Sequence, residues 1–381
     1  MRLLIIDKTA VLDSNHERFE KISAFSDVEL CVLSPTRWIE HSREVQAERT
    51  SHPGYEIRLG RTFWTGSYSR GFYLSGLREA LREFQPDVIQ LLEEPWSLFA
   101  GQAVRLARRH APNAKILFYT WENIYREGTY CSKLDPLHRR IERRAFKECV
   151  SGVCATKTAG EVLRKRGFEG ETLIIPYGIS SEFILNEGDL RSRVEQPLTD
   201  PPRIGYIGRL LSMKGVDTLV RALPLTPANL VVIGDGPAES SLKGLAGVMG
   251  VSDRIEWLGS KPPAEIPRLM AGLDLLVLPS RTTPAWAEQL GRVMLEAMGS
   301  GVPVIGSSSG CIPEVVGDAG LIFPEDDSRC LAESTRNLIS GFRLREDCIR
   351  KGWEKIRERY TWDRFSADLV DLYRKVESQS L

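Results

Sequence analysis

The chain has 381 residues, of which 42% are hydrophobic and 27% are charged, and its 51 basic residues balance its 51 acidic ones. Domains usually contain roughly 100–200 residues, so this length predicts two domains. The balanced charge argues against a general nucleic-acid-binding protein, whose binding face is strongly basic.

The N-terminus carries a short apolar run, residues 3–6, which Asp7 and Lys8 interrupt. A secretory signal needs a longer apolar stretch, and a membrane-spanning helix needs about 18 apolar residues, so neither is predicted. We therefore expect a cytoplasmic protein, at most peripheral to the inner face of a membrane. Seven cysteines without paired C-x-x-C spacing predict free thiols; they are Cys31, Cys131, Cys149, Cys154, Cys311, Cys330 and Cys348.

Short apolar runs alternate with helical periodicity through the first half of the chain, which is typical of a doubly wound parallel sheet. Helices are expected at 75–84 and 98–109. The expected strands are 3–7, 29–33, 87–92, 115–120, 152–155 and 172–175.

A second alternating series follows a stretch, residues 186–202, that loses periodicity and gathers Gly, Asp, Arg and Pro. We interpret this stretch as a linker between an N-terminal domain, 1–185, and a C-terminal domain, 203–362. The expected strands are 203–207, 230–233, 254–258, 275–278, 302–305 and 321–323, with helices at 215–223, 290–300 and 331–340. Two Rossmann-like domains facing across a cleft would place a ligand site in that cleft.

A glycine turn follows the first strand of the second half. Gly208 precedes Arg209, and Lys214 comes five residues later, just before a helix. Glycines let a phosphate approach the backbone, and a helix N-terminus adds partial positive charge, so both cations could reach one diphosphate. An ordinary turn with two surface cations is the alternative.

A second glycine turn follows the strand at 230–233. Gly234 and Gly236 flank Asp235, and Pro237 marks the start of a helix. The turn lies at a carboxyl strand end, where α/β sheets bind ligands. A purely structural turn is the alternative.

Two glutamates, Glu288 and Glu296, flank the start of the helix expected at 290–300. At a rise of 1.5 Å per residue, their carboxylates would lie on the order of 10 Å apart. That span suits a ligand with hydroxyl groups at both ends, while the backbone N–H groups of residues 289–291 would face an anion or hydroxyl. A solvated pair on an amphipathic helix is the alternative.

The text around these glutamates resembles the donor site of glycosyltransferase family 4, whose members are retaining enzymes of GT-B architecture. The matching text is Trp-Ala-Glu-Gln-Leu-Gly-Arg at 286–292, Glu-Ala-Met at 296–298, Gly-Val-Pro-Val-Ile at 301–305 and Ile-Pro-Glu-Val-Val at 312–316. Both glycine turns match further family motifs in the same order. The resemblance is strong over 175–375 and weaker over 70–175. It also implies that a helix at 363–381, after Tyr360-Thr361-Trp362, packs back on the first domain.

The resemblance implies roles for single residues. Arg209 and Lys214 would bind the donor diphosphate and stabilise its charge as it leaves. Glu288 would contact the transferred sugar, and Glu296 the nucleotide ribose. Backbone groups of the donor site would come from Gly208, Gly234, Gly236, Gln289, Leu290 and Gly291. No acidic metal-binding cluster is apparent in the sequence, so we expect no cofactor and no metal.

The acceptor side departs from the family pattern. Many members carry a histidine after the fourth strand of the first domain, where this chain has Thr120 and Trp121. Glu122 and Asn123 could bind acceptor hydroxyls instead, or cap the next segment. His16 is a further acceptor-side candidate, with a plain surface histidine as the alternative.

A basic helix is expected around residues 139–147, where Arg139, Arg143 and Lys147 recur every four residues. It could bind to the surface of an anionic membrane that carries a lipid-linked acceptor. Because Glu142 and Glu148 dilute its charge, a merely solvated face is the alternative.

The sequence therefore predicts a hexosyltransferase with a UDP- or GDP-sugar donor and a glycan, lipid-linked or other glycoconjugate acceptor, in polysaccharide biosynthesis. A non-hydrolysing nucleotide-sugar epimerase has a similar pair of domains, but the family-4-like text at 286–316 argues against it. A non-catalytic nucleotide-sugar-binding protein is the third interpretation, against which the intact charged residues argue.

Overall fold

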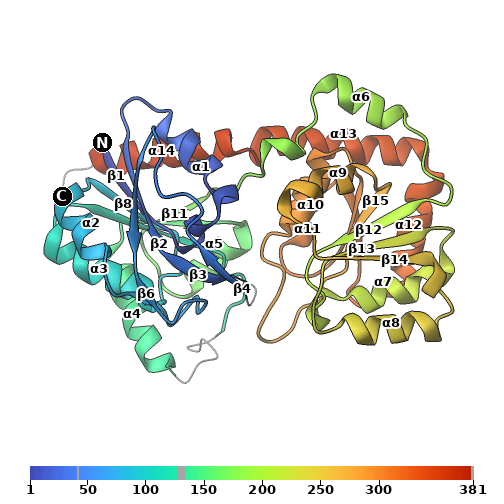
Figure 1. Cartoon of the computed structure of the whole chain (residues 1–381), viewed down its shortest axis with the longest axis horizontal. Coiled ribbons are helices and arrows are strands. Elements are labelled where there is room, and N and C mark those ends of the chain that lie inside the picture. Colours follow the sequence, from blue (N-terminus) through green and yellow to red (C-terminus); the bar gives the residue numbers. More distant parts are fainter. Residues whose placement is uncertain (41–42, 127–133, 379–381) are drawn as a thin grey trace. The chain divides into compact units, whose positions relative to one another are not determined.

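The computed structural model describes residues 1–40, 43–126 and 134–378, so Cys131 lies outside the described residues. The chain divides into two compact units (Figure 1). Unit 1 comprises Met1–Gly178 and Trp362–Leu381, and unit 2 comprises Ile179–Thr361.

Unit 1 is built on a seven-stranded sheet in which every neighbouring pair is parallel. Its strand order is β11-β10-β9-β8-β1-β2-β5. The strands are β1 (Arg2–Ile6), β2 (Glu29–Pro35), β5 (Glu56–Gly60), β8 (Val88–Leu91), β9 (Lys115–Thr120), β10 (Ser151–Cys154) and β11 (Glu171–Ile174). Two short antiparallel pairs are β3 (Arg37–Glu40) with β4 (Arg43–Gln46), and β6 (Thr62–Phe63) with β7 (Phe72–Tyr73).

Helices cover both faces of this sheet. The helices are η1 (Lys8–Val11), η2 (Asp13–Asn15), α1 (Glu17–Ser23), α2 (Leu77–Phe84), α3 (Leu98–His110), α4 (Asp135–Glu148), α5 (Lys157–Lys165) and α14 (Trp362–Ser378). Buried side chains of α2–α5 share one apolar cluster with the sheet, and those of α1 and α14 share another.

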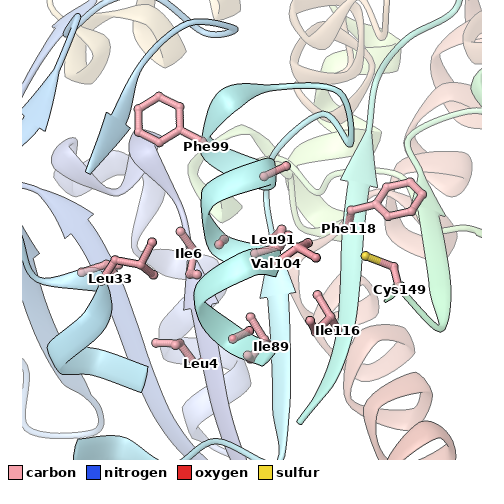
Figure 2. Close-up of a cluster of buried hydrophobic side chains, with 14 of the residues drawn as sticks. Leu4, Ile6, Leu33, Ile89, Leu91, Phe99, Val104, Ile116, Phe118 and Cys149 are labelled. Atoms are coloured by element: carbon pink, nitrogen blue, oxygen red, sulfur yellow. The ribbon is translucent and has the colours of Figure 1, made fainter. Parts of the chain in front are cut away.

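The alternation of β1 explains why both clusters exist. Leu4 and Ile6 belong to the first cluster, while Leu3 and Ile5 belong to the second. Successive strand residues point to opposite faces, so a continuous apolar run buries both faces of the sheet. Figure 2 shows the first cluster, with Phe99 and Val104 of α3 drawn beside side chains of the strands.

Unit 2 is built on a six-stranded parallel sheet of order β14-β13-β12-β15-β16-β17. Its strands are β12 (Arg203–Ile207), β13 (Asn229–Ile233), β14 (Ile255–Gly259), β15 (Leu275–Leu278), β16 (Val304–Ser307) and β17 (Gly320–Phe323). The predicted fold class of two Rossmann-like, doubly wound parallel-sheet domains is confirmed.

Helices flank these strands. The longer ones are α6 (Glu187–Glu195), α7 (Val216–Ala222), α8 (Glu239–Val248), α9 (Ile266–Ala271), α10 (Arg292–Gly299), α11 (Ile312–Val316), α12 (Ser328–Ser340) and α13 (Phe342–Arg359). Short 3-10 turns are η3 (Ser181–Phe183), η4 (Ser212–Lys214), η5 (Leu223–Leu225), η6 (Ser252–Arg254) and η7 (Pro263–Glu265).

The predicted linker at 186–202 is wrong, because its first half folds as α6 within unit 2. Leu190 and Val194 of α6 pack against Ile349 and Trp353 of α13. Arg193 also holds α6 against the rest of unit 2, because its guanidinium donates to three backbone carbonyls, among them that of Gly301 at 3.2 Å. The stretch is polar apart from a narrow apolar stripe on α6, so its composition did not predict a helix.

The chain passes between the units at two neighbouring points. Gly178 ends the first segment of unit 1, and Trp362 begins α14, which lies in unit 1. Ile179 and Thr361 form a parallel bridge, and the Ile179 N–H donates to the Tyr360 carbonyl at 2.8 Å. The Tyr-Thr-Trp element singled out in the sequence therefore marks the return of the chain.

Candidate donor site

Two glycine turns meet at the carboxyl ends of β12 and β13. A Cβ atom on Gly234 (φ 135°) would lie 2.0 Å from the Gly208 carbonyl oxygen. One on Gly236 (φ 156°) would lie 2.4 Å from the Leu210 oxygen, and the Leu210 N–H donates to the Asp235 carbonyl at 2.8 Å. The glycines are therefore required by the close approach of two backbones, which supports the structural alternative without excluding a ligand above them.

A third glycine sets the position of Lys214. Gly215 has a left-handed φ of 66°, and a Cβ there would lie 1.9 Å from the Pro279 carbonyl oxygen. The turn after β12 is thus pressed onto the loop after β15, and the Arg281 N–H donates to the Met213 carbonyl at 2.8 Å. Two segments that are far apart in the sequence are joined in this way.

This junction brings Lys214 and Glu288 together. The Lys214 Nζ lies 2.7 Å from the Glu288 Oε2 and 4.6 Å from the centre of the Trp286 ring. The Lys214 side chain keeps 21% of its surface exposed, whereas the Glu288 side chain keeps 9%. The ammonium is held in place by a carboxylate and an aromatic face, yet a ligand can still reach it.

Glu288 is itself positioned by two other groups. The Ser280 hydroxyl donates to the Glu288 Oε2 at 2.6 Å, and the Cys311 N–H donates to the Glu288 carbonyl at 3.0 Å. A Cβ on Gly310 would lie 2.2 Å from that carbonyl oxygen, so only glycine fits there. Sequence reasoning missed Ser280, although a polar residue at a carboxyl strand end was a usable signal.

Helix α10 begins at Arg292, two residues later than predicted. Gly291 is its N-cap with a left-handed φ of 63°, Gln289 is exposed and Leu290 is buried. The Glu296 carboxylate pairs with Arg292 at 3.0 Å, and burial raises the pKa of Glu296. Its predicted contact with a ribose stays a prediction.

Arg209 differs from Lys214 in having no fixed partner. Its carbonyl accepts from the Tyr206 hydroxyl at 2.7 Å, which anchors the backbone. Within residues 1–40, 43–126 and 134–378, the half-buried guanidinium makes no ion pair or side-chain hydrogen bond. It offers planar donors that suit a phosphate.

In unit 1, Glu94 holds the loop that carries Glu122 and Asn123. Its carboxylate accepts from the Thr120 hydroxyl at 2.6 Å and from the Trp121 N–H at 2.8 Å. Burial, followed by the neighbouring Glu122 carboxylate, raises the pKa of Glu94 to about 7. Sequence reasoning missed Glu94, which follows β8 and the adjacent Glu93.

His16 is a core residue in the structure, and its proposed place on the acceptor side is not supported. The ring is fully buried, with Nδ1 2.6 Å from the Tyr55 hydroxyl and Nε2 2.8 Å from the Ala10 carbonyl. Burial lowers the pKa of His16. The isolated histidine in the sequence gave no sign of these two partners.

The basic helix predicted around 139–147 is α4, and the two acids expected to dilute its charge pair with cations of other helices or loops. Glu142 is buried and pairs with Arg166 at 2.8 Å, while Glu148 pairs with Arg108 at 2.6 Å. The exposed cations of α4 are Arg139, Arg140, Arg143, Arg144 and Lys147. No described carboxylate pairs with them, so the helix presents more net charge than its sequence indicates.

Two kinds of feature are absent from the described residues. No group of three or more His, Cys, Asp or Glu residues there could hold a metal ion. No helix there is long and apolar enough to cross a membrane.

Comparisons with known proteins place unit 2 in context. Residues 190–355 match the family model described as glycosyl transferases group 1. A GDP-mannose-dependent alpha-(1-6)-phosphatidylinositol monomannoside mannosyltransferase of Mycobacterium tuberculosis is 34% identical over 195 residues, 49% of this chain and 50% of that protein. An alpha-D-kanosaminyltransferase of Streptomyces kanamyceticus is 27% identical over 64% of each chain. The chain thus spans about half the length of the mannosyltransferases it matches.

Solved structures match over the whole chain. A sucrose-phosphate synthase from Thermosynechococcus elongatus has a TM-score of 0.72 at 19% identity and covers 100% of both chains. The Anabaena protein HepE, crystallised with UDP, has a TM-score of 0.71 at 16% identity over 98% of this chain and 100% of that one. These similarities establish the GT-B fold.

Proposed function

We propose that the protein is a retaining hexosyltransferase that takes a sugar from a UDP- or GDP-linked donor. The supporting observation is that Lys214 and Ser280 both donate to the Glu288 carboxylate, within the region that matches the glycosyl transferase model. Two relatives are named as enzymes that transfer a sugar, one of them from GDP-mannose. Both UDP-linked and GDP-linked donors, with any hexose, fit this proposal.

The charges suggest how the site acts. As the bond between the sugar and the diphosphate breaks, negative charge accumulates on the diphosphate, and Lys214 and Arg209 would stabilise it. Preorganised charge of this kind is usually the largest single contribution to catalysis. Glu288 would hold a sugar hydroxyl and orient Lys214, and Glu296 would bind the ribose. We propose that neither a cofactor nor a metal is needed.

Backbone groups complete the proposed donor site. The N–H groups at Gln289, Leu290 and Gly291 precede α10, whose N-terminus carries partial positive charge. The turns at Gly208, Gly234 and Gly236 would form the wall beside the diphosphate. Retention would follow from attack on the face that the diphosphate leaves.

On the acceptor side, we propose that Glu122 and Asn123 contact hydroxyls of a glycan, lipid-linked or other glycoconjugate acceptor in polysaccharide biosynthesis. The exposed cations of α4 would bring the protein to an anionic inner membrane surface from the cytoplasm. The M. tuberculosis relative is named for a phosphatidylinositol mannoside acceptor, which agrees with a lipid-linked class. No nucleic-acid partner is proposed.

The test has two stages. A thermal-shift screen of UDP, GDP, ADP and their sugars should raise the apparent stability with one nucleotide class, because ligands stabilise the native state they bind. The donor so identified is then incubated with candidate acceptors, and the product anomer is determined by NMR. A new sugar nucleotide formed without acceptor would identify an epimerase, and an inverted product would contradict retention.

A further inference from the structure

A small basic pocket lies on unit 1, beside the solvent face of α4. Its volume is about 180 Å³, below the roughly 300–1,000 Å³ of sites for drug-sized ligands. Five cations and one carboxylate line it: Arg126, Arg139, Arg143, Lys165, Arg166 and Glu142. The rings of Tyr125 and Phe146 complete its wall. Its size suits one small anionic group.

The lining cations fall into two sets. Arg166 is mostly buried and pairs with Glu142 at 2.8 Å, and Arg126 pairs with Glu122 at 3.0 Å, so each of these two cations already has an acidic partner. Arg139, Arg143 and Lys165 are exposed, and no described acid neutralises them. Three cations that no described acid neutralises line one small pocket, which favours an anion with several acceptor oxygens, such as a phosphate.

We propose that this pocket binds the phosphate of an anionic lipid headgroup. The next stripe around α4 continues the basic surface with Arg140, Arg144 and Lys147, all exposed, and adds Leu137 with 43% of its surface exposed. Tyr125, at the pocket, is 45% exposed. Cations interleaved with exposed apolar and aromatic side chains suit the headgroup layer of a bilayer rather than a freely diffusing anion.

The inference rests on the proposed membrane contact of α4 and is independent of sugar transfer. A basic face that acts only by its charge would respond to the surface charge of a bilayer, whatever the headgroup. A pocket would distinguish headgroups. Phosphatidic acid presents a phosphomonoester, whereas glycerol covers the phosphate of phosphatidylglycerol.

The experiment measures binding of the full chain to phosphatidylcholine vesicles that contain phosphatidic acid or phosphatidylglycerol, adjusted to equal surface potential. We expect a preference of roughly fivefold or more for phosphatidic acid, because its phosphomonoester offers the pocket cations more acceptor oxygens than a phosphodiester does. The pocket variant Arg143→Gln/Lys165→Gln should lose this preference. The matched variant Arg140→Gln/Arg144→Gln should weaken binding to both vesicles alike and keep the preference.

Each of the other possible outcomes contradicts one part of the proposal, either the pocket or the membrane contact. Equal binding to both vesicles, or a preference that survives in the pocket variant, overturns the pocket. Saturable binding of inorganic phosphate that requires Arg143 and Lys165, without any vesicle preference, would assign the pocket to a soluble anion. Absence of binding to every anionic vesicle overturns the membrane contact itself, while transfer to a soluble acceptor analogue would still stand. Circular dichroism checks that both variants are folded.

Discussion

The carboxyl ends of the two sheets hold charged pairs of different kinds. In unit 1, Lys8 pairs with Glu93 and Arg18 with Asp7, and each of these four side chains keeps 6% or less of its surface exposed. In unit 2, Lys214 pairs with Glu288 but keeps 21% exposed. Fully buried ion pairs mainly stabilise the fold, whereas a partly exposed cation such as Lys214 can also bind a ligand. The comparison supports our proposal that the donor diphosphate binds in unit 2.

The largest expected effect is that of Lys214→Met. It removes the cation while keeping an unbranched side chain beside Trp286, so charge stabilisation is lost with little change of shape. We expect kcat to fall on the order of 10²-fold, as for the loss of one preorganised donor at a transition state. The measurement is the steady-state rate of sugar transfer with the donor found in the thermal-shift screen.

Its matched control is Lys243→Met. Lys243 pairs with Glu239 within α8 and is about half exposed, so its removal should leave turnover nearly unchanged. Glu288→Gln should also lower kcat, by roughly tenfold or more, because the amide cannot hold both Lys214 and Ser280 as a carboxylate does. Normal turnover in Lys214→Met and Glu288→Gln would contradict the donor site.

Much of the fold was predictable because both sheets are parallel and buried on both faces. Such strands read as continuous apolar runs, so β9, β12 and β15 agree with their predicted residues. The edge strand β5 was missed, since Glu56 and Arg58 interrupt its apolar pattern. The hairpin β6–β7 was missed as well, because each of its strands has only two residues.

The donor-side residues were predictable in kind but their mutual contacts were not. Lys214 and Glu288 lie 74 residues apart in sequence, and the close approach of Gly215 to Pro279 helps to bring them together. The acceptor side was predicted less well, because His16 and Glu94 are defined by partners distant in sequence. Periodicity identifies elements, whereas burial of a polar group depends on tertiary packing.

A smaller effect is expected from Gly215→Ala. A left-handed φ and a Cβ placed 1.9 Å from the Pro279 oxygen should destabilise unit 2 by about 1–3 kcal/mol and displace Lys214. Gly244→Ala is the matched control, since Gly244 lies within α8 with nothing within 4 Å of its Cβ position. That change should stabilise by about 0.5–1 kcal/mol. The free energy of unfolding from chemical denaturation and the kcat of each variant provide the measurement. Equal effects of the two substitutions would contradict the role of Gly215 in joining the turn after β12 to the loop after β15.

The smallest expected effect concerns the pH response of unit 1. Burial raises the pKa of Glu94 from about 4.5 to about 7, so between these values the folded state binds a proton that the unfolded state has lost. The free energy of unfolding must then fall as pH rises through this window, by at most about 1.4 kcal/mol per pH unit for one proton. Glu94→Gln removes this proton and should flatten the slope.

Hydrogen exchange at the amides of β9, next to Thr120 and Trp121, measures this slope locally between pH 5 and 7. Glu161→Gln, an exposed site on α5, should leave the slope as it is in the parent chain. If Glu94→Gln also leaves it unchanged, the Glu94 carboxyl is not the titrating group. If the slope flattens while donor binding is unaffected, the buried Glu94 carboxyl stabilises the carboxyl end of β9 separately from the site around Lys214.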